Sequence, residues 1–199
     1  LDESVQKIFR LSMMTNNVKQ NSEKWIRTQN ILTWLVARLP KESQFTIITF
    51  NDNVKSHSAN NWIGGDDGPN IVSTLNSAMK EVPVNGTNLE KALLKAKSMS
   101  PIPDAVYIIT DGLPTLGESV SGLSISLQER NCLRNKARIT PVCRHTLFQK
   151  AKNSYFKDKI IKTSTILLPL EGDRRAASDY WNLALQTGGT SISPSRDWP

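Results

Sequence analysis

The stretch Ala105-Val-Tyr-Ile-Ile-Thr-Asp-Gly112 decides the fold expected for this chain of 199 residues. Its first six residues are all apolar, aromatic or β-branched, which is typical of a strand that is buried on both faces of a parallel sheet. The Asp-Gly pair can be an ordinary turn, but its glycine also lets the chain leave the strand sharply. We therefore expect Asp111 at the carboxyl edge of a sheet, where open α/β folds bind their ligands.

Strand and helix patterns alternate on both sides of this stretch. Apolar residues recur at helical spacing in five segments, 22–39, 70–81, 88–99, 146–155 and 176–187. Further strands are expected at 45–50 and 164–169, both buried on two faces, and at the sheet edge at 190–193. The alternation predicts one α/β domain over residues 1–199, with a doubly wound, mostly parallel, Rossmann-like sheet flanked by helices.

The formal net charge of +7 favours association with nucleic acid, an anionic membrane or an acidic protein. The Lys and Arg residues are nevertheless scattered, without the zinc-finger spacing or aromatic-basic platform of nucleic-acid readers, so nucleic acid is not an expected partner. No Gly-Lys-Ser/Thr loop or G-x-S-x-G turn occurs, which gives no reason to expect a small-molecule substrate or catalysis.

A second polar turn, Asn85-Gly-Thr-Asn-Leu89, comes directly before the helix predicted at 88–99. Thr87 or Asn88 can simply cap this helix, or the Thr87 hydroxyl can face the same sheet edge as Asp111. Hydroxyl and carboxylate oxygens are hard donors, which suit Mg²⁺, Mn²⁺ or Ca²⁺ better than zinc or copper. The two turns together predict a divalent-cation site, with Mg²⁺ as the first choice.

The chain resembles the von Willebrand factor type A family in these same segments. Residues 45–52 are similar to a family strand and its turn, 86–89 to the metal-site threonine loop, and 108–112 to the strand with the metal-site aspartate. The resemblance spans nearly the whole chain and implies a metal-ion-dependent adhesion site in which Thr87 and Asp111 hold the cation, directly or through water. An open coordination position would bind an acidic group of a protein partner.

The family also takes metal ligands from a D-x-S-x-S motif after its first strand. Here Asp2-Glu-Ser4-Val-Gln6 matches only as D-x-S-x-Q, and one residue precedes it. Either Asp2 and Ser4 are ligands in a degenerate motif, or the motif and its strand lie upstream and residues 1–21 are an insertion. In the second case the sheet lacks its first strand, and the metal site can be empty in this chain.

Three other residues are expected to contact the partner, Asn88 and Gly112 beside the cation and Trp62 in an acidic loop. The ending of the chain resembles a group of bacterial membrane-anchored domains found with TolQ/ExbB-type proton-channel components. That resemblance implies a periplasmic or extracytoplasmic location, with an anchor that is absent from these residues.

Residues 116–160 are expected to form a variable basic insertion, with Cys132 and Cys143 in one loop as either a small disulfide or two free thiols. Two functions compete with cation-mediated binding. One is a metal-free scaffold domain of a membrane-associated complex. The other is a metal-dependent hydrolase, for which no base or nucleophile near Asp111 can be named.

Overall fold

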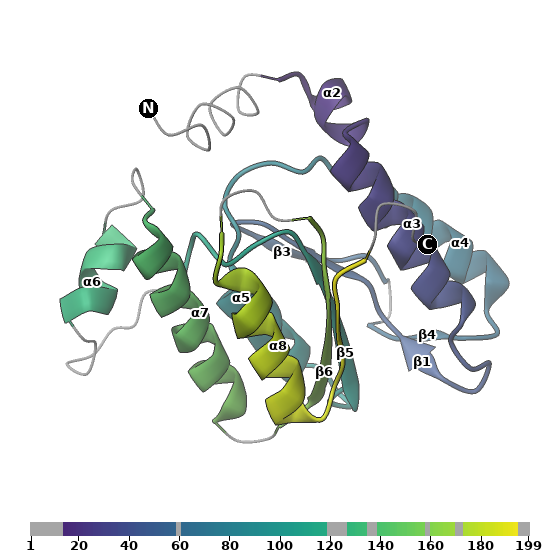
Figure 1. Ribbon diagram of the computed structural model, residues 1–199. Coiled ribbons are helices and arrows are strands. Elements are labelled where there is room, and N and C mark those ends of the chain that lie inside the picture. Colours follow the sequence, from purple (N-terminus) through teal and green to yellow (C-terminus); the bar gives the residue numbers. More distant parts are fainter. Residues whose placement is uncertain are drawn as a thin grey trace. The chain divides into compact units, whose positions relative to one another are not determined.

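The computed structural model describes residues 14–58, 61–118, 127–134, 139–157, 160–169 and 173–194, and Figure 1 shows its elements. The described chain divides into two compact units. Of the described residues, the first unit holds those within 14–49 and 54–85, and the second holds those within 50–53 and 86–194. None of the described helices combines the length and apolar character that spanning a bilayer requires.

The first unit packs helices against short strands. Its elements are α2 (Asn16–Gln20), α3 (Glu23–Ala37), β1 (Gln44–Phe45), β2 (Ile48–Phe50), β3 (Val54–Ser56), β4 (Ile63–Gly64) and α4 (Gly68–Met79). The last residue of β2, Phe50, is assigned to the second unit. Phe45, Ile47, Ile63 and Ala78 form a buried core, against which apolar side chains of α3 and α4 pack. The helices predicted at 22–39 and 70–81 are thus confirmed, and α4 begins two residues earlier than expected.

The strand predicted at 45–50 is broken into two pieces with different partners. β1 pairs with β4 in antiparallel fashion, whereas β2 pairs with β3. Phe45 and Ile47 are buried, while the residues between and after them remain partly exposed. The prediction of one continuous strand buried on both faces is therefore wrong, because an unbroken apolar run does not reveal where a chain changes its pairing partner.

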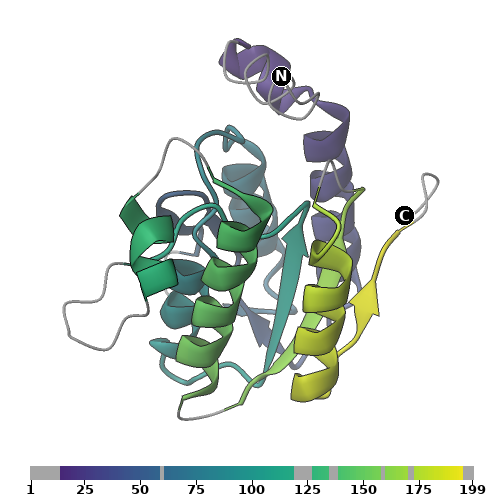
Figure 2. The same ribbon diagram turned by 60° about the vertical axis from the view of Figure 1, so that its left-hand side comes forward.

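The second unit is a three-stranded parallel sheet flanked by helices, with strand order β5-β6-β7. Its elements are α5 (Leu89–Lys97), β5 (Ala105–Thr110), α6 (Leu127–Arg134), α7 (Pro141–Phe156), β6 (Lys162–Leu167), α8 (Ala176–Thr187) and β7 (Ser191–Ile192). Figure 2 shows α7 and α8 side by side along β5 and β6. The chain is thus a mixed α/β protein with a small parallel sheet, compatible with the Rossmann-like fold that the alternation predicts.

β5 and β6 pair over their whole length, from Ala105 opposite Lys162 to Thr110 opposite Leu167. The inner face of β5 carries Ile108 into a single core that also includes buried side chains of α5, α7 and α8. Tyr107 lies on the opposite face and is 54% exposed. The prediction that 105–110 is buried on both faces is therefore wrong, because Ile108 and Tyr107 point to opposite faces of β5 and the face that carries Tyr107 is left largely exposed.

The end of α8 fixes the edge strand β7 beside β6. Gly188 closes the helix in the left-handed conformation that glycine adopts most easily, with φ of 71°, as the sequence predicts. The Thr187 hydroxyl accepts a hydrogen bond of 3.1 Å from the Thr163 backbone N–H. The last residue of α8 is therefore hydrogen-bonded to β6, and the chain continues from there into β7, which pairs with β6 in parallel.

Cys132 and Cys143 form a disulfide that joins α6 to the first turn of α7. The two cysteines lie on two helices, so their assignment to a single loop is wrong. Thr140 caps α7 by accepting a hydrogen bond from Cys143 N–H at 3.1 Å, and Pro141 occupies the first turn. This capping sequence starts α7 five residues before the helical pattern predicted at 146–155.

His57 is a buried histidine of the first unit and lies between two hydroxyl groups. Its Nε2 is 2.8 Å from Thr49 Oγ1, and its Nδ1 is 2.8 Å from Ser77 Oγ. Burial lowers the pKa of His57 below 6.5, an effect that Glu81 opposes and Lys55 reinforces. The folded protein thus favours the neutral imidazole.

This lowered pKa leads us to expect a loss of stability in mild acid. Below about pH 6.5 His57 binds a proton in the unfolded chain but stays neutral in the folded chain. The free energy of unfolding therefore decreases as the pH falls toward the folded-state pKa. Urea unfolding from roughly pH 5 to 8 should show this slope, and His57→Gln should remove part of it. An identical slope in both proteins would contradict the expectation.

Candidate functional site

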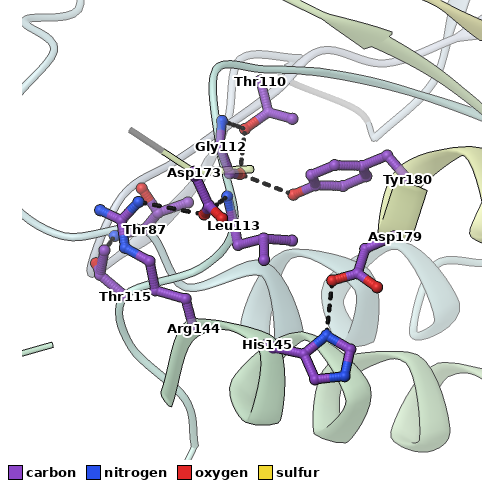
Figure 3. A network of polar contacts seen from close by, with 10 residues as sticks. All are labelled: Thr87, Thr110, Gly112, Leu113, Thr115, Arg144, His145, Asp173, Asp179 and Tyr180. Atoms are coloured by element: carbon purple, nitrogen blue, oxygen red, sulfur yellow. Dashed lines mark hydrogen bonds and ion pairs between the residues drawn. The ribbon is translucent and has the colours of Figure 1, made fainter. Parts of the chain in front are cut away.

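Two loops meet at the carboxyl end of β5, within the second unit. The backbone oxygen of Thr87 accepts hydrogen bonds from Thr115 N–H at 3.0 Å and Leu116 N–H at 3.1 Å. In return, Thr87 N–H donates to Thr115 Oγ1 at 2.8 Å. The turn before α5 and the loop after Asp111 are therefore connected directly to each other, as Figure 3 shows for Thr87 and Thr115.

Gly86 makes this close approach possible. A Cβ atom at this position would lie 2.7 Å from Leu116 Cδ1 and 2.8 Å from Thr115 Oγ1, distances that real Cβ atoms essentially never show. A larger residue at position 86 would force the side chains of Leu116 and Thr115 to shift, and Thr115 Oγ1 is the acceptor for Thr87 N–H. The glycine thus leaves room for this contact between the loops.

The two predicted metal ligands are accessible oxygen donors at this edge. Thr87 is partly buried, and its hydroxyl has no hydrogen-bond partner among the described residues. Asp111 follows the last residue of β5 and is exposed. A hydroxyl and a carboxylate suit a hard divalent cation, but the described residues contain no group of three or more His, Cys, Asp or Glu side chains that could enclose a metal.

The turn that contains Gly112 is fixed by hydrogen bonds to its carbonyl oxygen. The Tyr180 hydroxyl of α8 donates to this oxygen at 3.1 Å, and the Thr110 hydroxyl donates to it at 3.2 Å. Complete burial raises the pKa of Tyr180 far above its usual range, and the nearby carboxylate of Asp111 raises it further. Tyr180 therefore remains a hydrogen-bond donor at any physiological pH.

Asp173 and Arg144 are a charged pair beside this turn that the sequence analysis did not single out. Asp173 is 3% exposed, and its Oδ2 lies 3.3 Å from both Leu113 N–H and Arg144 Nη1. Its other carboxylate oxygen, Oδ1, is buried and has no hydrogen-bond partner among the residues that the structure describes. Asp173 comes shortly after β6 as Asp111 comes after β5, so the position of strand ends is the signal that could have identified it.

Asn88 links the site to a buried cluster of charges. It caps α5, since its Oδ1 accepts from Lys91 N–H at 3.0 Å, which confirms one of the two predicted caps. Its Nδ2 donates to Glu118 Oε1 at 2.6 Å. Asn88 is only 4% exposed, so its side chain is already engaged inside the unit, and its contact with a partner stays a prediction.

The cluster itself joins α5, α7 and the loop that follows Asp111. Glu90 pairs with Lys150 of α7, accepts from Ser154 Oγ at 2.8 Å, and accepts from Glu118 N–H at 2.9 Å. Lys150 also donates to the Glu118 carbonyl oxygen at 2.6 Å. A second pair, His145 Nδ1 and Asp179 Oδ2 at 2.7 Å, connects α7 to α8. The site thus rests on helices that are held together by paired polar groups.

The remaining predicted residues lie elsewhere. Asp2 and Ser4 are outside the residues that the structure describes, so their role as ligands stays a prediction. Trp62 belongs to the first unit and is partly exposed. Within the second unit the structure links Thr87 and Asn88 to the loop that follows the Asp111-Gly112 turn. Most of the expected insertion at 116–160 is formed by α6 and α7.

No protein-family model matches this chain, and no curated protein is significantly similar to it.

The buried pair of Glu90 and Lys150 gives a stability prediction. Lys150→Met should cost about 3–5 kcal/mol, because it leaves the Glu90 carboxylate buried without its cation. The double variant Glu90→Leu/Lys150→Met should recover part of this loss, because it removes the unpaired carboxylate but also the acceptor for Ser154 and for Glu118 N–H. Urea unfolding measures both. The matched control is Lys55→Met, which breaks the exposed Lys55–Glu81 pair and should cost less than about 1 kcal/mol; equal losses at the two sites would refute the prediction.

The contact between Tyr180 and Gly112 can be tested in the same way. Tyr180→Phe removes only the hydroxyl that donates to the Gly112 carbonyl and should lower the free energy of unfolding by about 1 kcal/mol. Tyr107→Phe removes a hydroxyl from the exposed face of β5 and should change stability little. If the two variants unfold at the same urea concentration, the Tyr180 hydroxyl does not stabilise the turn.

Proposed function

We propose that this protein is a binding module of the von Willebrand factor type A kind, with the doubly wound sheet of that family. It captures an acidic group of a partner protein through a divalent cation, Mg²⁺ in the first instance, held by Thr87 and Asp111. Mn²⁺ and Ca²⁺ are the alternatives. The module binds and does not catalyse.

The observation that carries this proposal is the direct link between the two loops. Thr87 is hydrogen-bonded through both its N–H and its C=O to the loop after Asp111. A cation ligated by both residues needs a fixed spacing between the loops, because small errors in ligand position weaken metal binding. The Thr87 backbone provides this spacing, while its hydroxyl makes no hydrogen bond to the described residues and so remains available for a ligand.

The chemistry of the edge favours binding over hydrolysis. The donors are hard oxygens, and one open coordination position is sufficient for a carboxylate ligand from the partner. A hydrolase would also need a base aligned with a reacting group. Of the two histidines in the sequence, only His145 belongs to the second unit, and its Nδ1 is engaged with Asp179 between α7 and α8. We therefore propose a protein with an acidic group as the ligand.

The disulfide supports a proposed extracytoplasmic location, since such bonds persist mainly in oxidising compartments. By its resemblance, the module would act at the outer face of a bacterial membrane with an anchor outside these residues. TolQ/ExbB-type components are the proposed membrane partners. The second candidate function is a metal-free scaffold in such a complex. It is favoured by Arg144, which already supplies a positive charge beside the Asp111-Gly112 turn.

Calorimetric titration of the full-length protein with Mg²⁺ tests the cation site. Thr87→Val and Asp111→Asn should each weaken Mg²⁺ binding by at least about tenfold, because each removes one proposed ligand. Asp104→Asn is the matched control. It neutralises an exposed aspartate at the opposite end of β5 and should leave Mg²⁺ affinity unchanged.

Two results would count against the cation site. One is the absence of both heat and a Mg²⁺-dependent thermal shift in the full-length wild-type protein, which would favour the metal-free scaffold. The other is an equal loss in Asp104→Asn and Asp111→Asn, which would mean that Mg²⁺ responds only to overall charge.

A further inference from the structure

Arg144 places its guanidinium group beside Gly112 of the Asp111-Gly112 turn. A Cβ atom added at Gly112 would lie 3.8 Å from Arg144 Nη1, which is an ordinary van der Waals contact. The same nitrogen pairs with Asp173 Oδ2 at 3.3 Å. The arginine side chain remains 21% exposed, and its other N–H groups have no acceptor among the residues that the structure describes.

The helix that carries Arg144 holds this group in place. Arg144 lies in the first turn of α7, where its backbone N–H donates to the Thr140 carbonyl at 3.0 Å. The preceding residue, Cys143, is linked covalently to α6, and its backbone N–H donates to the hydroxyl of the cap residue Thr140. Asp173 is almost fully buried, so its carboxylate has little freedom to move with the Arg144 side chain that it pairs with. The guanidinium is thus fixed before any ligand arrives, which reduces the entropy cost of binding.

We propose that Arg144 is a second binding contact for the partner, which receives the carboxylate of an acidic side chain with its remaining N–H groups. A planar guanidinium presents parallel N–H groups that match the two oxygens of a carboxylate. The contact needs no metal ion.

The charges around Arg144 select a singly charged ligand. Asp173 neutralises one side of the guanidinium, and Asp111 lies exposed on the adjoining turn. A doubly charged phosphate would meet these carboxylates at short range, whereas one carboxylate meets less repulsion. An aspartate or glutamate side chain of a protein therefore fits the site better than a phosphate group does.

This inference deepens the proposed function and rests on it for the identity of the partner. It differs from the metal site in one measurable respect, because a contact made by Arg144 persists when divalent cations are removed. Binding in the presence of a chelator therefore separates the two contacts.

The test uses nuclear magnetic resonance on the full-length protein with N-acetyl-aspartate N-methylamide, which carries one side-chain carboxylate. The amide signals of Gly112 and Leu113 report the titration, once in EDTA and once in Mg²⁺. We expect saturable shifts in EDTA. Arg144→Met/Asp173→Asn should weaken binding at least about tenfold. This double variant removes both members of the pair, so it leaves no buried charge unpaired and keeps the net charge.

Two controls define the contact. Lys152→Met removes a positive charge from the same helix and should leave the titration unchanged. N-acetylglycine offers a main-chain carboxylate in place of a side-chain one and should bind more weakly.

Several outcomes would overturn the inference. Shifts that require Mg²⁺ and are equal in the wild type and the double variant would leave the cation site as the sole contact, and the proposed function would stand. A loss in Lys152→Met as large as in the double variant would assign the effect to bulk charge. No shift under either condition, or tighter binding of N-acetylglycine, would also exclude Arg144 as a receptor for acidic side chains.

Discussion

The parallel pairing of β5 with β6 is the interaction on which the second unit depends. Six consecutive residues of each strand are in register, so both strands end at the same edge of the sheet. Asp111 follows one strand and Asp173 lies just beyond the other. α7 and α8 must begin at this edge because each returns the chain for the next parallel strand. The ends of two strands and the starts of two helices thus converge where Thr87 is attached.

Local sequence patterns were sufficient to predict the elements around this edge. The bounds of β5 and α8 agree with the sequence because a continuous β-branched run and a helix closed by Gly188 are signals contained within a few residues. The cap at Asn88 follows in the same way from the turn before α5. The rule that ligands bind at the carboxyl ends of parallel strands led us to expect Thr87 near Asp111, and the structure joins Thr87 to the loop that follows Asp111.

Features that depend on distant residues could not be read from the sequence. Asp173 contacts Leu113 across 60 positions of the chain, and Lys150 pairs with Glu90 across the same separation. The division of residues 45–50 between two pairing partners has the same cause, since it is set by where β3 and β4 lie. Arg144 illustrates the difficulty best. In the sequence it is one of many scattered basic residues, and only the fold distinguishes it by giving it a buried partner.

The disulfide has a consequence for the order of the molecule in different redox environments. α6 has only eight residues, which is shorter than an isolated helix needs to persist in water. Its covalent attachment at Cys132 restricts the unfolded chain and keeps the helix beside α7. In a reducing medium that restriction disappears. The oxidation state of two sulfur atoms therefore determines how firmly this corner of the protein is ordered, and with it the helical turn from which Arg144 projects.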